Sequence, residues 1–338
     1  MAGEGGEVTA KLINLNAELA RGGVGLIISG HSYVRPEGQA SRGQTGVYKD
    51  ELIPGLKGLT GAVHEAGGKI VMQLAHAGHF AAEKLIGQPP IVVSDYEGLA
   101  QSPRREISKG DIREIVQAFA DAAGRARAAG FDGVQIHSAH GYLLNQFLSP
   151  IYNKRRDEYG GSLVNRARIH LEVYKAIREA VGEGYPVLIK INCRDFAESG
   201  LSLDESIEAA GLLTDAGLDA IEVSGGLPIS GKLGPIRRGI DSQEKEAYFS
   251  EELKAFRKAF EIPLILVGGI RSFEVAEKLV QSGMADYISM SRPFIREPDL
   301  VNRWKAGDRR RAECLSDNLC FKSAFAGEGI YCAQKTKS

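Results

Sequence analysis

Short apolar segments alternate with amphipathic segments along most of this chain, and this alternation restricts the fold more than any other feature. The apolar segments predict buried parallel strands at residues 24–30, 69–75, 133–138, 186–192, 220–225, 263–269 and 287–292. Helical periodicity predicts helices at residues 9–22, 50–66, 111–130, 163–181, 202–216, 249–260, 273–282 and 298–306. Strands that alternate with helices in this way form a parallel sheet with the helices outside it.

We therefore predict an α/β fold, a (β/α)8 TIM barrel whose first strand is missing from this chain, because only seven strands are found. No GxGxxG motif follows any predicted strand, so a doubly wound dinucleotide-binding sheet has no support. No linker divides the chain, which predicts a barrel over residues 1–307 and a C-terminal tail over residues 308–338. Residues 80–105 interrupt the alternation, and we interpret them as a short hairpin over the barrel mouth.

Charge and composition exclude several classes of partner. The formal net charge is -1, from 42 basic and 43 acidic residues, so we expect neither a nucleic-acid nor a membrane-surface partner. No apolar run approaches the ~18 residues of a membrane span, and residues 1–11 do not resemble a secretory signal. We expect a cytoplasmic protein with its four cysteines reduced, acting on a small molecule. The sequence leaves open whether it forms a homo-oligomer.

Residues 131–142 combine a buried strand with three side chains that can hold or move protons. The apolar run ends in His137, and His140 and Tyr142 follow it directly. The carboxyl ends of the strands carry the chemistry of a parallel barrel. The stretch therefore predicts an acid-base site in which these three residues are catalytic.

Histidines gather at the ends of the predicted strands. Five of the seven lie at or just past a carboxyl end, namely His31, His76, His79, His137 and His140. Each one alone is readily explained as a hydrogen-bonded structural histidine, but three successive strand ends converge on one face of a barrel. Converging imidazoles either bind a metal ion or recognise a substrate oxygen. We predict no metal, because the strand-end carboxylates, Asp195 and Glu222, offer no obvious pairing with a histidine.

Two polar residues lie inside apolar strands. Lys190 is surrounded by Val187, Leu188, Ile189 and Ile191, and a lysine there is costly without a negative or electron-rich partner. It can pair with a carboxylate inside the barrel, form a Schiff base, or place its charge against a cofactor. Gln73 occupies a similar position in its strand. Both residues suggest that something polar and planar occupies the upper interior of the barrel.

The last two strands end in residues that suit a phosphate. Gly268 and Gly269 follow one strand, and Ser291 and Arg292 follow the next. Barrels often bind phosphate with these loops, where glycine permits close backbone approach and arginine grips oxygens bidentately. The glycines alone are equally explained by a tight turn. With Arg292 beside them, they favour a phosphorylated planar cofactor, for which flavin mononucleotide (FMN) is suitable.

The chain resembles the old yellow enzyme family of FMN-dependent ene reductases. The densest match covers residues 137–172, with further matches at residues 18–30, 73–78, 267–272 and 291–300. The resemblance implies that NAD(P)H reduces FMN, which then passes hydride to the activated C=C of an α,β-unsaturated carbonyl compound. It implies that His137 and His140 bind the substrate oxygen and that Tyr142 donates a proton. The cofactor contacts implied are Gly30, Gln73, Lys190, Gly268, Gly269, Ser291 and Arg292.

The sequence departs from the family pattern at three places. Members usually have about thirty more residues before the position of Met1, which supply the first strand and flavin contacts. Longer members carry a cysteine-ligated iron–sulfur cluster, whereas here Asp317 replaces one cysteine beside Cys314, Cys320 and Cys332. We expect no cluster, because four thiolates are the norm. His79 stands where arginine is common.

These departures keep three alternatives open. One is another FMN-barrel oxidoreductase, of the NADH oxidase or amine dehydrogenase type. The second is a truncated, flavin-free remnant that acts only as a binding partner. The third is a metal-dependent barrel hydrolase.

Overall fold

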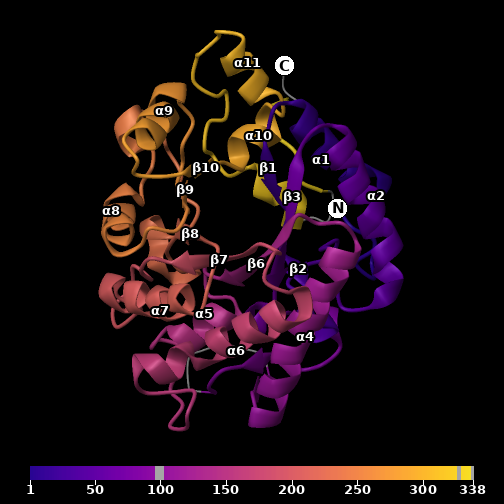
Figure 1. Ribbon diagram of the computed structural model, residues 1–338, viewed down its shortest axis with the longest axis vertical. Coiled ribbons are helices and arrows are strands. Elements are labelled where there is room, and N and C mark those ends of the chain that lie inside the picture. Colours follow the sequence, from indigo (N-terminus) through magenta and orange to yellow (C-terminus); the bar gives the residue numbers. More distant parts are fainter. Residues whose placement is uncertain (96–102, 326–328, 336–338) are drawn as a thin grey trace.

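Seven parallel strands form the centre of the molecule (Figure 1). The computed structural model describes residues 1–95, 103–325 and 329–335. The strands follow one another in the sheet in chain order, as β1 (Leu26–Ile28), β3 (Lys69–Ala75), β6 (Gly133–Ser138), β7 (Val187–Asn192), β8 (Ala220–Ser224), β9 (Leu264–Val267) and β10 (Tyr287–Ser289). A short strand, β2 (Ser32–Tyr33), also pairs with β3 in parallel. All seven predicted strands and their parallel arrangement are confirmed.

Helices surround these strands on the outside (Figure 1). They are α1 (Ala10–Arg21), α2 (Ile53–Glu65), α3 (Glu83–Ile86), α4 (Lys109–Ala128), α5 (Leu143–Leu148), α6 (Leu163–Val181), α7 (Leu203–Asp215), α8 (Ser250–Ala259), α9 (Phe273–Gln281), α10 (Arg292–Arg296), α11 (Leu300–Lys305) and α12 (Cys320–Phe325). Single 3-10 turns occur at Pro36–Gly38, Asp50–Leu52, Gly78–Phe80, Pro228–Leu233 and Gln243–Lys245. The eight predicted helices are confirmed. None of the described helices has the length and apolar character needed to cross a bilayer.

Local sequence explains where the longest helices begin. Ser108 caps α4, and the Asp111 carboxylate accepts in return from the Ser108 backbone N–H. Ser202 and Glu205 form the same reciprocal pair at the start of α7. Such pairs satisfy N–H groups that have no partner inside the helix. The helices therefore start at fixed points relative to the strands that precede them.

Alternation of side chains along the strands divides the barrel into an outer and an inner face. Outward residues such as Ile70, Val134 and Ile189 are fully buried in the main core against the helices. Inward residues include Leu188 and Ala220, which pack with Ile265 in a separate apolar cluster. The next inward positions toward the carboxyl ends are polar and form the floor of the site described below. Every second residue of a strand points inward, so the barrel interior is built from successive layers of side chains. Its lower layer is apolar, and the layer above it, toward the carboxyl ends of the strands, is polar.

The sheet is open between its first and last strands. Over the described residues, β1 pairs only with β3 and β10 pairs only with β9, so no ladder joins β10 to β1. Tyr287 at the start of β10 is 53% exposed, although most strand residues in the neighbouring β9 are buried. The predicted seven strands therefore form a barrel wall with one unclosed side.

Residues 80–105 do not form the predicted hairpin. Strand β4 (Ile91–Val92) pairs with β5 (Arg105–Glu106) in parallel, whereas a hairpin requires antiparallel strands. Residues 96–102 lie outside the described part of the chain. Sequence pattern alone did not reveal that these two strands pair in parallel.

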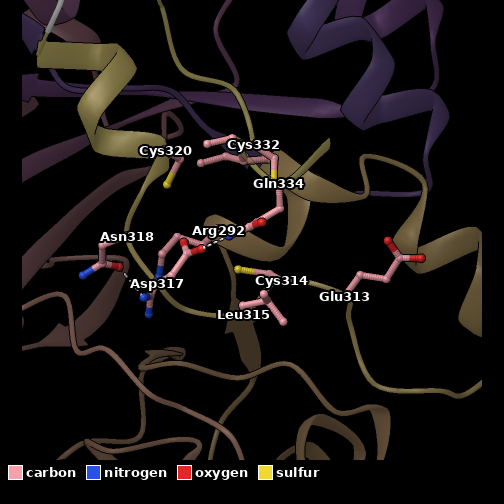
Figure 2. Close-up of a pocket in the computed structure, with 11 residues that line it drawn as sticks. Arg292, Glu313, Cys314, Leu315, Asp317, Asn318, Cys320, Cys332 and Gln334 are labelled. Carbon is pink, nitrogen blue, oxygen red and sulfur yellow. Dashed lines mark hydrogen bonds between the residues drawn. The ribbon is translucent and has the colours of Figure 1, made fainter. Parts of the chain in front are cut away.

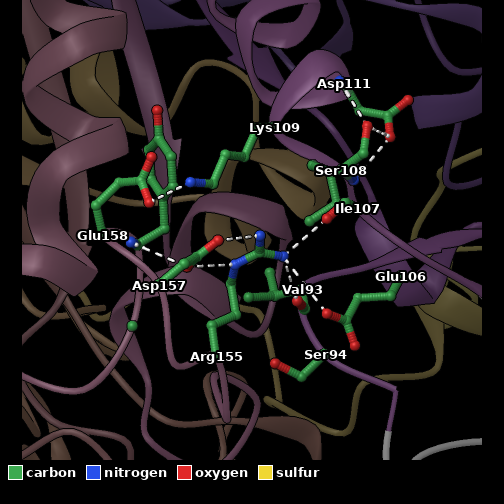
Figure 3. A network of polar contacts seen from close by, with 12 residues as sticks. Val93, Ser94, Glu106, Ile107, Ser108, Lys109, Asp111, Arg155, Asp157 and Glu158 are labelled. Atoms are coloured by element: carbon green, nitrogen blue, oxygen red, sulfur yellow. Dashed lines mark hydrogen bonds and ion pairs between the residues drawn. The ribbon is translucent and has the colours of Figure 1, made fainter.

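Arg155 fastens this segment to the loop after α5 (Figure 3). Its Nη1 donates to the carbonyl oxygens of Val93 and Ile107, at 3.2 and 2.7 Å. Its Nε and Nη2 bind the Asp157 carboxylate bidentately, at 3.0 and 2.6 Å. The Arg155 side chain is only 7% exposed, so these bonds are shielded from water. A single guanidinium thus joins two segments that are far apart in sequence.

Replacing Arg155 with methionine is expected to lower the free energy of unfolding by about 2–3 kcal/mol, because a partly buried carboxylate and two carbonyls lose a buried donor. Chemical denaturation with urea measures this change. The matched control is Arg105→Met, since Arg105 also holds a carboxylate, Asp111, bidentately but is 51% exposed. An exposed pair contributes only about 0–1 kcal/mol. Equal losses in the two variants would contradict the proposed importance of burial.

Candidate active site

A chain of four polar side chains crosses the inner face of the barrel. Gln73 donates to Gln135 Oε1 at 2.6 Å, and Gln135 donates to Glu222 Oε2 at 2.9 Å. Lys190 Nζ donates to the other Glu222 oxygen at 2.9 Å. Gln135 is on β6 and Glu222 is on β8, with β7 between them. Their contact therefore lies on the concave side, above the apolar layer.

One of the three predicted explanations for Lys190 was pairing with a carboxylate inside the barrel, and the structure contains this pair. The Glu222 side chain is 1% exposed and that of Lys190 is 15% exposed. The pairing follows from register, since Lys190 and Glu222 are opposite each other on β7 and β8. Glu222 was noticed in the sequence only as a possible metal ligand, and Gln135 was missed. Gln135 could have been found in the sequence in the same way as Gln73, because each is a polar residue inside an apolar strand.

His137, near the end of β6, lies together with His140 and Tyr142, which follow the strand. The rings of His137 and Tyr142 are stacked, with centroids 4.5 Å apart and an interplanar angle of 26°. The ring of His140 stands edge-on to His137 at 5.4 Å. A hydrogen bond of 2.7 Å joins His140 Nε2 to Ser224 Oγ at the end of β8. The structure thus brings the three predicted residues to one end of the barrel.

Two asparagines hold the turn that carries these rings. His140 and Gly141 have positive φ angles of 62° and 81°, which is uncommon for a histidine. The His140 N–H donates to Asn192 Oδ1 at 3.0 Å, and the Gly141 N–H donates to Asn145 Oδ1 at 2.7 Å. A Cβ at Gly141 would come 2.8 Å from the Phe80 ring. The turn is therefore fixed by neighbouring elements rather than by its own sequence.

Burial keeps both imidazoles uncharged at neutral pH. Burial is the largest cause that lowers the pKa of His137 and of His140 well below 6.5, and the Lys190 charge lowers both further. His137 Nδ1 accepts from the Ala139 N–H at 3.3 Å, so the proton of the neutral ring is on Nε2. Burial also raises the pKa of Tyr142 to about 12. The site therefore offers neutral N–H and O–H donors.

The other strand-end histidines differ in how close they come to this group. His31 Nε2 lies 3.2 Å from Tyr142 Oη, and its ring is 6.1 Å from that of His137. His79 packs instead against Phe80, with ring centroids 4.0 Å apart, and it is the Phe80 ring that neighbours Tyr142. His76 Nδ1 accepts from the Gly78 N–H at 3.1 Å. In the described residues, no three histidine, cysteine or acidic side chains are arranged to hold a metal ion.

The residues predicted to hold a phosphate lie at the ends of β9 and β10. Gly268 and Gly269 have φ angles of 143° and 72°, and a Cβ on Gly269 would come 2.8 Å from the Tyr248 ring. Arg292 Nη1 donates to Asn318 Oδ1 at 2.6 Å and to the Arg237 carbonyl at 2.8 Å. Packing against Tyr248 already requires glycine at 269. The tight turn is therefore present, and Arg292 lies near it with its Nη1 already hydrogen-bonded to the protein.

Arg237 is a second cation at this end of the barrel, and sequence reasoning missed it. Its guanidinium lies over the rings of Phe196, Tyr248 and Phe249, at 5.2, 4.4 and 5.2 Å from their centroids. Its Nε and Nη2 are buried without a hydrogen-bond partner among the described residues. Burying an unpaired cation is costly, so an anion is the natural complement. Arg237 and Arg292 together suit a phosphate group.

Gly30 and Ser291 are exposed at the ends of their strands. A Cβ built on Gly30 meets no atom within 4 Å, so the space beside it is open. Ser291 precedes α10, and its hydroxyl makes no capping bond there. Both positions are therefore accessible to a bound group.

Three of the four cysteines line a pocket in the C-terminal tail (Figure 2). Cys314, Cys320 and Cys332 share it with Arg292 and Asp317. Burial and the nearby Cys314 raise the pKa of the Cys320 thiol. The Asp317 carboxylate accepts from Gln334 Nε2 at 2.8 Å and from the Leu319 N–H at 3.0 Å. These residues do not fit a cluster held by four thiolates.

A parallel barrel wall with polar side chains at the carboxyl ends of its strands is typical of α/β-barrel enzymes, and the sequence comparison identifies the family. The family model for the NADH:flavin oxidoreductase / NADH oxidase family matches residues 2–310. The chain belongs to this family, which is the old yellow enzyme family. The family implies FMN as cofactor and NAD(P)H as reductant.

Individual relatives differ in their names and in length. An NADH oxidase of Thermoanaerobacter brockii is 39% identical over 326 residues, 94% of this chain and 49% of the relative. An NADPH dehydrogenase of Bacillus licheniformis is 38% identical over 280 residues, 82% of this chain and 78% of the relative. The chain thus spans about half the length of the first relative and most of the second.

Solved structures confirm the (β/α)8 barrel class. An old yellow enzyme homologue from Zymomonas mobilis has a TM-score of 0.77 at 28% identity, covering 98% of this chain and 90% of its own. A histamine dehydrogenase from Rhizobium sp. 4-9 has a TM-score of 0.83 at 25% identity, covering 98% of this chain and 48% of its own. Proteins that are named for different activities therefore share this backbone fold.

Proposed function

We propose that this protein is an FMN-dependent ene reductase, which transfers hydride from NAD(P)H to the activated C=C of an α,β-unsaturated carbonyl compound. The observation that carries the proposal is the group of two uncharged imidazoles and a protonated phenol at one end of the barrel. This arrangement supplies donors for a carbonyl oxygen and an acid for a carbon atom within one small space.

Each side chain has a distinct part in the proposed reaction. His137 donates through Nε2 to the carbonyl oxygen, and His140 lies beside it for a second contact. Neutral donors stabilise the negative charge that develops on this oxygen, because they are already oriented and poorly hydrated. Tyr142 gives its proton to the α-carbon as general acid. The Asn192 and Asn145 contacts keep the three groups in place for this step.

The residues present also suit the cofactor that the family implies. FMN, when bound, accepts hydride from NAD(P)H and delivers it to the β-carbon of the substrate. Lys190 and Gln73 would contact its ring, and Gly268, Gly269, Ser291 and Arg292 would contact its phosphate. Gly30 leaves space beside the ring. The unpaired Arg237 nitrogens support an anion at the phosphate end.

Reconstitution with FMN tests the proposal directly. The purified protein is expected to have the visible absorption bands of bound flavin, to lose them when titrated with NADPH or NADH under argon, and to regain them on addition of 2-cyclohexenone. A stopped-flow spectrophotometer separates the two steps. A protein that stays colourless after reconstitution would favour the flavin-free remnant, and stoichiometric metal by elemental analysis would favour the hydrolase.

A second candidate is oxidation of an amine, which the backbone similarity to a histamine dehydrogenase favours. Bleaching of the bound flavin by histamine, without NADPH, would support it. Failure of 2-cyclohexenone to restore the colour after NADPH reduction would support it further. The cytoplasmic location, homo-oligomer formation and the separate C-terminal tail stay predictions.

A further inference from the structure

His31 is hydrogen-bonded to the phenol of Tyr142, and no part of the proposed function uses it. It lies between β1 and β2, directly before β2, and its Nε2 is 3.2 Å from Tyr142 Oη. The centroids of the two rings are 5.1 Å apart. Its other nitrogen, Nδ1, lies 2.7 Å from Gln44 Nε2. His31 therefore stands between a glutamine and the proposed proton donor.

The orientation of the Gln44 amide is fixed by backbone groups on both sides. The Ala40 N–H donates to Gln44 Oε1 at 2.7 Å, and Gln44 Nε2 donates to the His31 carbonyl oxygen at 3.0 Å. If the amide were flipped, its NH2 group would face another donor, the Ala40 N–H, and its oxygen would face another acceptor, the His31 carbonyl. Neither pair could form a hydrogen bond. The group that faces His31 Nδ1 is therefore the amide NH2, which can only donate.

This orientation fixes the tautomer of His31. Burial lowers the pKa of His31 to about 4, so the ring is neutral at physiological pH. Because Nδ1 accepts from Gln44, the single ring proton is on Nε2. The His31 Nε2–H then donates to Tyr142 Oη, and the phenol keeps its own proton for another acceptor. Among the described residues, the ionisable groups that interact with His31 include Tyr142, His137 and His140.

We propose that His31, oriented by Gln44, is a positioning residue that directs the Tyr142 proton toward the substrate and stabilises the phenolate left behind. This inference rests on the proposed function of Tyr142. In the step, the O–H bond of Tyr142 breaks, its electron pair stays on Oη, and the proton bonds the α-carbon as hydride reaches the β-carbon. Water then returns a proton to Oη. The His31 N–H lowers the cost of the charged phenol throughout.

His31→Phe removes the donor and keeps a planar ring. We expect 2-cyclohexenone to reoxidise the reduced protein roughly tenfold to a hundredfold more slowly, equivalent to one lost hydrogen bond to a charged oxygen. The solvent deuterium isotope effect on this step should rise, because proton transfer becomes more limiting. FMN content and the rate of bleaching by NADPH should stay near wild type. His31→Gln, which again offers an N–H, should recover most of the rate.

A double variant separates this role from a purely structural one. If His31 acts through Tyr142, adding His31→Phe to Tyr142→Phe should cause no further slowing. The inference would be overturned if the double variant were slowed by the product of the two single-variant factors. It would also be overturned if His31→Phe alone reoxidised at the wild-type rate. A normal rate in Tyr142→Phe alone would overturn the proposed function instead, and this inference with it.

Discussion

Replacing Tyr142 with phenylalanine is expected to slow the reoxidation of the NADPH-reduced protein by 2-cyclohexenone about 10²–10⁴-fold, the usual contribution of a positioned general acid. Phenylalanine keeps the six-membered ring of tyrosine, so it can stack on His137 in the same half-buried position. Bleaching by NADPH, which needs no proton from Tyr142, should be nearly unchanged. Stopped-flow absorbance under argon measures both steps in one preparation.

A distant phenol provides the matched control for this substitution. Tyr185 Oη donates to the Phe131 carbonyl at 2.9 Å, where the chain enters β6 rather than where it leaves. Tyr185→Phe therefore removes a partly buried hydroxyl without touching the site, and both half-reaction rates should stay at wild-type values. A Tyr142→Phe variant that reoxidises as fast as this control would exclude Tyr142 as the proton donor.

Sequence pattern predicted the wall of the barrel well because its signal is local. Apolar runs of strand length and the helices between them gave all seven strands, and the strand ends carry the predicted site residues. Register then follows from the parallel pairing. It places Gln73 beside Gln135, and Lys190 beside Glu222. Register therefore explains why these four polar side chains meet inside the barrel, and the polar, planar group predicted beside them stays a prediction.

What the sequence did not reveal depends on contacts between distant segments. Gln44 lies in a loop without periodicity, and nothing local indicates that its amide reaches His31. Arg237 lies in the long loop after β8, and only the folded chain places it over three aromatic rings. The parallel pairing of β4 with β5 likewise depends on a contact between separate segments of the chain. In each case a side chain or strand finds its partner through tertiary structure.

The ion pair on the barrel floor leads to the second large expected effect. Lys190→Met is expected to lower the free energy of unfolding of the flavin-free protein by about 3–5 kcal/mol, because it leaves the Glu222 carboxylate, 1% exposed, without its cation. The bond from Gln135 remains but does not neutralise the charge. Urea denaturation followed by circular dichroism measures the loss.

The double variant Lys190→Met/Glu222→Gln tests whether this loss comes from the unpaired charge. Glutamine keeps an oxygen to accept from Gln135 and carries no charge, so most of the lost stability should return. If Lys190 also contacts the reduced flavin ring, the double variant should fold well and yet have a lower flavin reduction potential than wild type. A double variant as unstable as Lys190→Met would mean that the lysine stem, rather than its charge, holds the barrel floor together.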